Sequence, residues 1–197
     1  FAGRIYKEAQ RLIALVEDVI KISQLDEGEI PYEWQKEDLY GISRDVFANL
    51  KEQAEQKKVH LYIQGNRVIA CTVRPILEEV LYNLCDNAIK YNKEDGTVHI
   101  LLSEEQDTVK VVVKDTGIGI PKEDQSRVFE RFYRADSSRN SKQGGSGIGL
   151  AIVKKVIEEH GGMIWAESKE GIGTVMNIRL KKVIKDNNES EGESQNE

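Results

Sequence analysis

Length, composition and charge point to a globular protein and exclude several other classes. The chain has 197 residues, of which 39% are hydrophobic and 31% charged, so it can bury a core. No run approaches the about 18 apolar residues that a membrane span needs, and no signal-peptide pattern opens the sequence; we therefore expect a cytoplasmic fragment. The formal net charge is −6, most of it from the acidic segment 186–197. The nearly neutral remainder gives no reason to expect nucleic-acid binding.

The first 28 residues predict one long amphipathic helix. Apolar residues recur at alternating spacings of four and three, as in a coiled-coil seam. They are Ile5, Ala9, Leu12, Val16 and Val19. Such a helix cannot bury its stripe alone, so we expect either a partner helix from outside this sequence or packing on its own domain. Asp26, Gly28 and Pro31 then break the pattern and mark a linker.

The elements after the linker predict an α+β protein. In chain order we expect a short strand at 32–35, a helix at 39–56, strands at 59–63 and 67–71, a helix at 75–91, strands at 98–103 and 109–114, a helix at 148–160, and strands at 163–168 and 174–180. This order favours a two-layer α/β sandwich, with a mixed sheet and helices on one face, over a regular βαβ repeat. We expect three regions: the helix at 1–28, a domain at 32–182, and an acidic disordered tail at 183–197. Cys71 and Cys85 lack the spacing of a metal site and are expected to be reduced.

The helix at 75–91 carries a polar face at spacings of three and four. This face has Glu79, Asn83, Asn87, Lys90 and Tyr91. Carboxamides one turn apart can offer neutral oxygens to Mg²⁺, and a lysine beside them would attract phosphates. Taken alone, the stripe is more typical of an ordinary solvated helix surface than of a binding site.

Asp115 follows a strand directly and precedes Gly117 and Gly119. A carboxylate at a strand end can accept a hydrogen bond from the amino group of adenine, and the glycines let backbone approach a flat ligand. Alone, the Asp-Thr-Gly run also fits a plain turn or a retroviral-type aspartic protease. That protease class is all-β, which the predicted helices contradict.

Glycines at positions 144, 145, 147 and 149 open the helix at 148–160. Free backbone N–H groups and the positive end of a helix suit a phosphate. The segment is neither a Walker A loop nor a dinucleotide fingerprint, because the required lysine and glycine spacing are absent. An aromatic segment at 128–134 and a polar run at 136–145 come before it and are typical of a mobile lid.

These segments together resemble the N, G1, F, G2 and G3 boxes of sensor histidine kinases of the PhoR-like or WalK-like class, in the GHKL ATPase superfamily. The matching runs are Asn83-Leu84-x-x-Asn87-Ala88-x-Lys90-Tyr91, Asp115-x-Gly117-x-Gly119, Phe129-Glu130-Arg131-Phe132-Tyr133, Gly145-x-Gly147-x-Gly149-Leu150 and Gly171-x-Gly173-Thr174. Five boxes in order, over about residues 32–182, make the resemblance specific. It implies a Bergerat-type fold that binds ATP with Mg²⁺.

The resemblance also implies which residues form the nucleotide site. They are Asn83, Asn87, Lys90, Tyr91, Asp115, Gly117, Gly119, Ile120, Phe132, Arg134, Gly145, Ser146, Gly147, Ile148, Gly149, Leu150 and Thr174. Asn87 and Asn83 would serve Mg²⁺, and Asp115 would recognise adenine. Arg131, Arg134 or Arg139 would reach the phosphates.

The N-terminal helix resembles the second helix of the dimerisation and histidine-phosphotransfer domain, ending in Ser23-Gln24-Leu25-Asp26. The family's His-Glu-x-x-x-Pro motif does not occur in the sequence, and we expect structural roles for His60, His99 and His160. The resemblance implies transfer of the ATP γ-phosphoryl group to a histidine outside this sequence, then to the receiver domain of a response regulator. It further implies a second kinase protomer and a membrane-anchored parent protein. Two alternatives stay open: a GHKL-type ATPase, although that class has glutamate at the position of Asn83, and an inactive nucleotide-binding scaffold.

Overall fold

The computed structural model describes residues 33–134 and 147–182, together with nine residues of the N-terminal segment. Those nine are Gly3, Ile5, Tyr6, Ala9, Leu12, Ile13, Val16, Ile20 and Ser23. All nine are helical and exposed, in agreement with a helix whose apolar stripe is not covered. The predicted lid at 136–145 and tail at 183–197 lie outside the described residues. Within the described part, no helix is long and apolar enough to cross a membrane.

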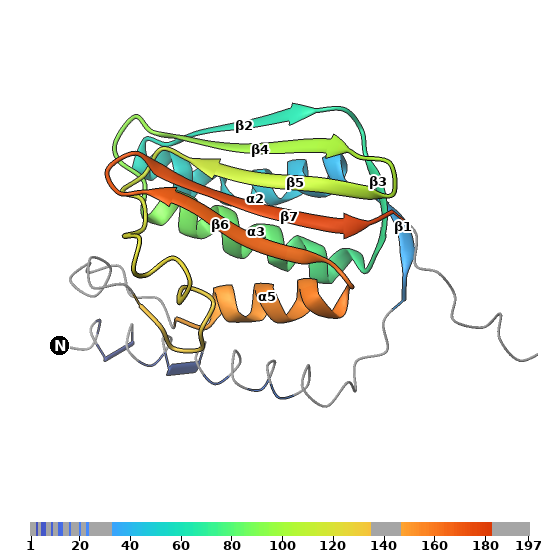
Figure 1. Ribbon diagram of the computed structural model, residues 1–197. Coiled ribbons are helices and arrows are strands. Elements are labelled where there is room, and N and C mark those ends of the chain that lie inside the picture. Colours follow the sequence, from blue (N-terminus) through green and yellow to red (C-terminus); the bar gives the residue numbers. More distant parts are fainter. Residues whose placement is uncertain are drawn as a thin grey trace, which may run out of the picture.

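The described domain has a layer of helices against one face of a sheet (Figure 1). The elements are β1 (Gln35–Asp38), α2 (Leu39–Lys57), β2 (His60–Gly65), β3 (Ile69–Thr72), α3 (Arg74–Lys90), β4 (Thr97–Glu104), β5 (Thr108–Asp115), α5 (Gly149–Glu159), β6 (Met163–Lys169) and β7 (Gly173–Lys181). The larger sheet has the strand order β2-β4-β5-β7-β6. Strands β2 and β4 are parallel and the other neighbours are antiparallel, so the sheet is mixed. The predicted α+β architecture is confirmed.

Alternating side chains join the sheet to the helices. In β5, Val109, Val111 and Val113 are buried, and in β7, Ile178 and Met176 lie opposite two of them. Successive side chains of a strand point to opposite faces, so one face of each strand supplies the core. Each buried valine, leucine or isoleucine contributes about 1.5–3 kcal/mol to folding.

Helices α2 and α3 both begin where their sequences predict. The Asp38 side chain caps α2 by accepting a hydrogen bond from the Tyr40 N–H at 3.1 Å. Pro75 lies in the first turn of α3, where no N–H is needed. The helix buries Cys85, and burial raises the pKa of this thiol, which makes it unreactive. Cys71 and Cys85 are both free thiols.

The first strand lies a few residues later than predicted. The sequence suggested a strand at 32–35, whereas β1 is Gln35–Asp38 and pairs antiparallel with β3, with Gln35 opposite Thr72. Pairing with β3 sets the position of the strand, and the local pattern does not contain this information. The small sheet is tied to the end of β7, because the Cys71 N–H donates to the Lys182 carbonyl at 3.2 Å.

Two histidines are held in structural contacts. The ring of His160 lies 4.5 Å from that of Trp34, and its Nδ1 is 2.8 Å from the Val156 carbonyl oxygen. His99 stacks on Tyr62 with ring centroids 4.9 Å apart. Burial lowers the pKa of both imidazoles below the usual value, which favours their neutral form. These contacts agree with the structural roles expected for them.

Candidate functional site

Two asparagines lie one turn apart on α3, and the first of them, Asn83, faces the start of α5. The Asn83 Nδ2 donates to the Glu79 carbonyl at 3.0 Å, which directs the other amide atom, Oδ1, toward Gly149. A Cβ at Gly149 would lie only 2.9 Å from this oxygen. Asn87 is half-buried, and its carboxamide bonds to none of the described residues. The structure therefore brings the predicted N and G2 segments together and leaves neutral oxygens available.

Lys90 forms an ion pair within α3. Its ammonium group forms an ion pair with Asp86 in the preceding turn. The same carboxylate accepts a hydrogen bond from Gln53 of α2 at 2.8 Å. Lys90 is thus linked through Asp86 to α2, and its role beside the phosphates stays a prediction.

Asp115, the last residue of β5, joins three segments. Its Oδ1 accepts hydrogen bonds from the Gly117 N–H at 2.8 Å and from the Thr174 N–H at 3.2 Å. No described residue bonds Oδ2, so this oxygen is available to accept a bond from a ligand. Burial raises the pKa of Asp115, and the two backbone bonds oppose this shift in part.

Gly117 and Gly119 allow the loop after β5 to pass between other backbone segments. A Cβ at Gly117 would lie 2.4 Å from the carbonyl oxygen of Tyr91, the residue that ends α3. Gly119 has a φ of +71°, and a Cβ there would lie 2.2 Å from the Lys169 carbonyl oxygen. The Ile118 N–H also donates to the Tyr91 carbonyl at 3.0 Å. The loop is therefore wedged between the end of α3 and the β6–β7 turn.

The F and G2 segments meet at Gly147. Its carbonyl accepts the Phe132 N–H at 2.9 Å, and Phe132 is 61% exposed with a left-handed φ of +63°. Gly145 and Ser146 lie outside the described residues. Ile148 is fully buried, so only its backbone could reach a ligand, and Leu150 packs against the core. The first turn of α5 has no side-chain cap, so a ligand could bind its N–H groups.

Contacts of Tyr133 with two residues just before the aromatic segment hold that segment in place. The hydroxyl group of Tyr133 donates to Asp124, and the Arg127 guanidinium lies 4.2 Å from the centre of the tyrosine ring. Arg134 is half-buried and is the last described residue before the gap. Ile120 is also half-buried and packs against the core.

The spatial arrangement of these segments is matched by a family model. Residues 72–184, more than half of the chain, match the model described as histidine kinase-, DNA gyrase B- and HSP90-like ATPase. The chain belongs to this ATPase family.

Its relatives include sensor histidine kinases. The chain is 37% identical over 185 residues to sensor histidine kinase WalK of Bacillus subtilis, covering 88% of this chain and 29% of WalK. It is 36% identical over 183 residues to histidine protein kinase SaeS of Staphylococcus epidermidis, covering 90% of this chain and 51% of SaeS. The catalytic domain of histidine kinase ThkA superposes with a TM-score of 0.67 at 29% identity, covering 76% of this chain and 96% of that domain. The chain thus spans about half or less of the two curated relatives, and it contains the ATP-binding catalytic domain of a sensor histidine kinase.

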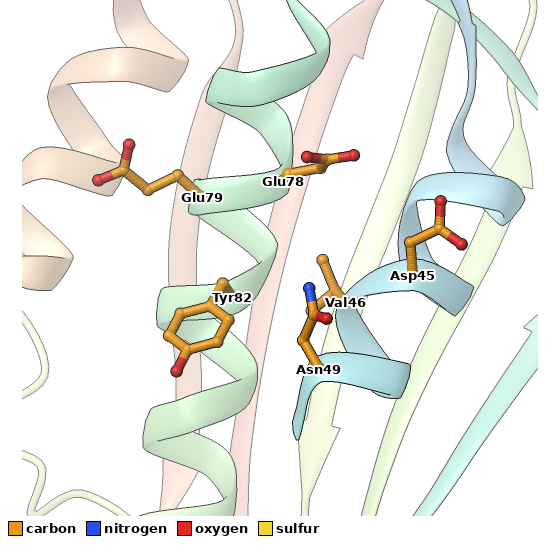
Figure 2. Close-up of a pocket in the computed structure, with 6 residues that line it drawn as sticks. All are labelled: Asp45, Val46, Asn49, Glu78, Glu79 and Tyr82. Carbon is orange, nitrogen blue, oxygen red and sulfur yellow. The ribbon is translucent and has the colours of Figure 1, made fainter. Parts of the chain in front are cut away.

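This ATPase-family domain also has an acidic groove of about 400 Å³ between α2 and α3 (Figure 2). Its lining residues are Asp45, Val46, Asn49, Glu78, Glu79 and Tyr82. Arg74 bonds two of the three carboxylates, Asp45 at 2.7 Å and Glu78 at 2.8 Å. With one arginine against three carboxylates the groove keeps a net negative charge, so it does not suit a triphosphate, although Glu79 belongs to the predicted polar face.

Three polar residues near the site were not predicted from the sequence: Asn92, Gln125 and Ser168. The Asn92 Nδ2 donates to the Ala88 carbonyl at 3.0 Å and to the Thr97 carbonyl at 3.1 Å. Gln125 and Ser168 bond the carbonyl and the N–H of Ile120, in the loop after Asp115. The sequence does carry a sign of the role of Ser168. This serine lies at an inward-facing position of β6, two residues after Ala166, where an apolar residue is usual.

Proposed function

We propose that this chain binds ATP with Mg²⁺ and, within a longer kinase, supplies the γ-phosphoryl group that is transferred to a histidine. The observation that carries the proposal is the Asp115 carboxylate, whose Oδ1 is occupied by backbone and whose Oδ2 is left without a described partner. An available carboxylate oxygen beside close-packed glycines suits the exocyclic amine of adenine.

The donor set also fits a magnesium ion. Mg²⁺ prefers oxygen ligands and keeps several waters or substrate phosphates in its shell. Asn83 and Asn87 offer half-buried carboxamides, and no group of three or more His, Cys, Asp or Glu side chains suited to a metal occurs in the described ranges. We infer that one or both carboxamides, and not a carboxylate cluster, would hold the ion, which would offset the charge of the phosphates.

Calorimetric titration with a non-hydrolysable ATP analogue tests this proposal. We expect saturable binding that strengthens with Mg²⁺. Asn87→Ala should weaken nucleotide binding about tenfold with Mg²⁺ present and have little effect in its absence. The reason is that the Asn87 carboxamide would act on the nucleotide only by coordinating the metal ion. Asn49→Ala, an exposed asparagine of α2, serves as the control. A folded chain that binds no nucleotide would favour the scaffold alternative.

The proposal extends to the three regions of the sequence. Residues 1–28 would form part of the histidine-phosphotransfer domain, 32–182 the catalytic domain and 183–197 an acidic tail. The phosphoryl group would pass to the receiver domain of a response regulator, with the N-terminal helix contributing to the docking surface. A second kinase protomer would complete the helical bundle, and the parent protein would be membrane-anchored.

The residue type at position 83 distinguishes a kinase from a GHKL-type ATPase. A carboxamide cannot accept a proton as a general base, whereas the glutamate found at this position in the ATPases can. We expect this chain alone to show no measurable ATP hydrolysis and no phosphohistidine after incubation with radiolabelled ATP. A separate protein with the His-Glu-x-x-x-Pro helix should acquire acid-labile label when it is added. Base-stable, acid-labile label on this chain alone would contradict the prediction.

A further inference from the structure

A half-buried serine at the end of β6, Ser168, connects the loop after Asp115 with the start of β7. The Oγ of Ser168 accepts a hydrogen bond from the Ile120 N–H at 2.8 Å and donates to the Gly173 carbonyl at 2.9 Å. It is also 2.9 Å from the Thr174 Oγ1. A hydroxyl group has one hydrogen and accepts up to two bonds, so Thr174 must be the donor in this third contact. Ser168 is therefore fully satisfied, and every bond goes to a residue of the proposed site or its neighbour.

Gln125 also connects Ile120 of the loop with Ser168. Its Nε2 donates to the Ile120 carbonyl at 3.0 Å and to the Ser168 carbonyl at 2.8 Å. Both hydrogens of the amide nitrogen are thus used. The peptide groups of Ile120 are fixed in both directions, by Ser168 on its N–H and by Gln125 on its carbonyl.

This network leads to the carboxylate that would recognise the base. Thr174 bonds the Ser168 hydroxyl through its side chain and the Asp115 Oδ1 through its backbone N–H. Ile120 closes the loop that begins at Gly117, whose N–H bonds the same oxygen. Neither Ser168 nor Gln125 lies in any of the five recognised segments, yet they set the distance between that loop and Asp115.

We propose that Ser168 and Gln125 are positioning residues that give the site its preference for adenine over guanine. The inference rests on the proposed function, in which the Asp115 carboxylate accepts a bond from the 6-amino group of adenine. Guanine has a carbonyl oxygen at that position and would be repelled. A looser loop would weaken the bond to adenine, whereas guanine has no such bond to lose.

The experiment measures the Kd values of non-hydrolysable ATP and GTP analogues for the full chain and its variants. Ser168→Ala should weaken ATP-analogue binding about tenfold, because the three hydrogen bonds that join the loop at Ile120 to the start of β7 are lost. GTP-analogue binding should change less than about twofold, since the lost bonds affect only the contact with adenine. Ser168→Thr keeps the hydroxyl and should restore most of the preference. Ser103→Ala, an exposed serine in β4, is the matched control.

Gln125→Glu gives a second, nearly isosteric test. It replaces two donated hydrogen bonds by a carboxylate facing two carbonyl oxygens, so the preference for ATP should fall at least as far as in Ser168→Ala. Gln64→Glu, at an exposed position of β2, makes the same charge change elsewhere. Equal weakening of both nucleotides, or a lower Tm with an unchanged ratio of Kd values, would overturn the inference and leave only a structural role. A parent chain that binds neither nucleotide would instead contradict the proposed function.

Discussion

Replacing Gly173 with alanine is expected to destabilise the domain by about 3 kcal/mol or more and to abolish nucleotide binding. Gly173 has a φ of +142°, a region open almost only to glycine, and a Cβ there would lie 2.1 Å from the Asp115 carbonyl oxygen. Backbone at the junction of β5 and β7 would have to move, and Asp115 would move with it. Urea denaturation and calorimetric titration measure the two effects.

Gly171→Ala provides the control in the same turn. Gly171 also has a positive φ, +76°, but a Cβ there would meet nothing within 4 Å. Backbone strain alone should therefore reduce the free energy of unfolding by about 1–2 kcal/mol, with binding retained. If both variants lost the same stability and kept the same affinity, the close approach of Gly173 to Asp115 would be of no consequence.

Asp115→Asn should separate binding from folding. The asparagine Oδ1 can still accept the bonds from Gly117 and Thr174, so the loop is retained. Its amide nitrogen would then take the place of Oδ2 and meet the amino group of adenine donor to donor. We expect ATP-analogue affinity to fall about a hundredfold, through the loss of a charge-assisted bond and the gain of a mismatched donor. Asp107→Asn, at an exposed turn position, removes the same charge elsewhere and should have no effect.

The same variant should be at least as stable as the parent at pH 7. Burial raises the pKa of Asp115 in the folded chain, so folding favours its protonated form. The stability that protonation provides is present below the unfolded pKa and is lost as pH rises through the folded value. Asparagine cannot lose a proton, so its stability advantage should be present at pH 7 and shrink as pH falls through the raised pKa. An advantage that grew on acidification would contradict this assignment.

Local pattern alone predicted much of the fold. The alternation in β5 and the proline at the start of α3 placed these elements within a residue or two of their observed bounds. Both signals act between near neighbours, through the strand repeat of two and the missing N–H of proline. The order of asparagine, aspartate and glycine segments likewise indicated the family, because the residue types needed for a nucleotide recur at set distances along the chain.

The sequence by itself determined which residue types line the site, and only the tertiary structure decided which of them meet. Lys90 pairs with Asp86 near α2, and Ile148 enters the core, because helix packing decides which way each side chain points. Ser168 contacts Ile120 across 48 positions of the chain, a contact created by the pairing of β6 with β7. Periodicity specifies a face within one element, whereas the partners on that face depend on strand register and helix packing, which no local pattern contains.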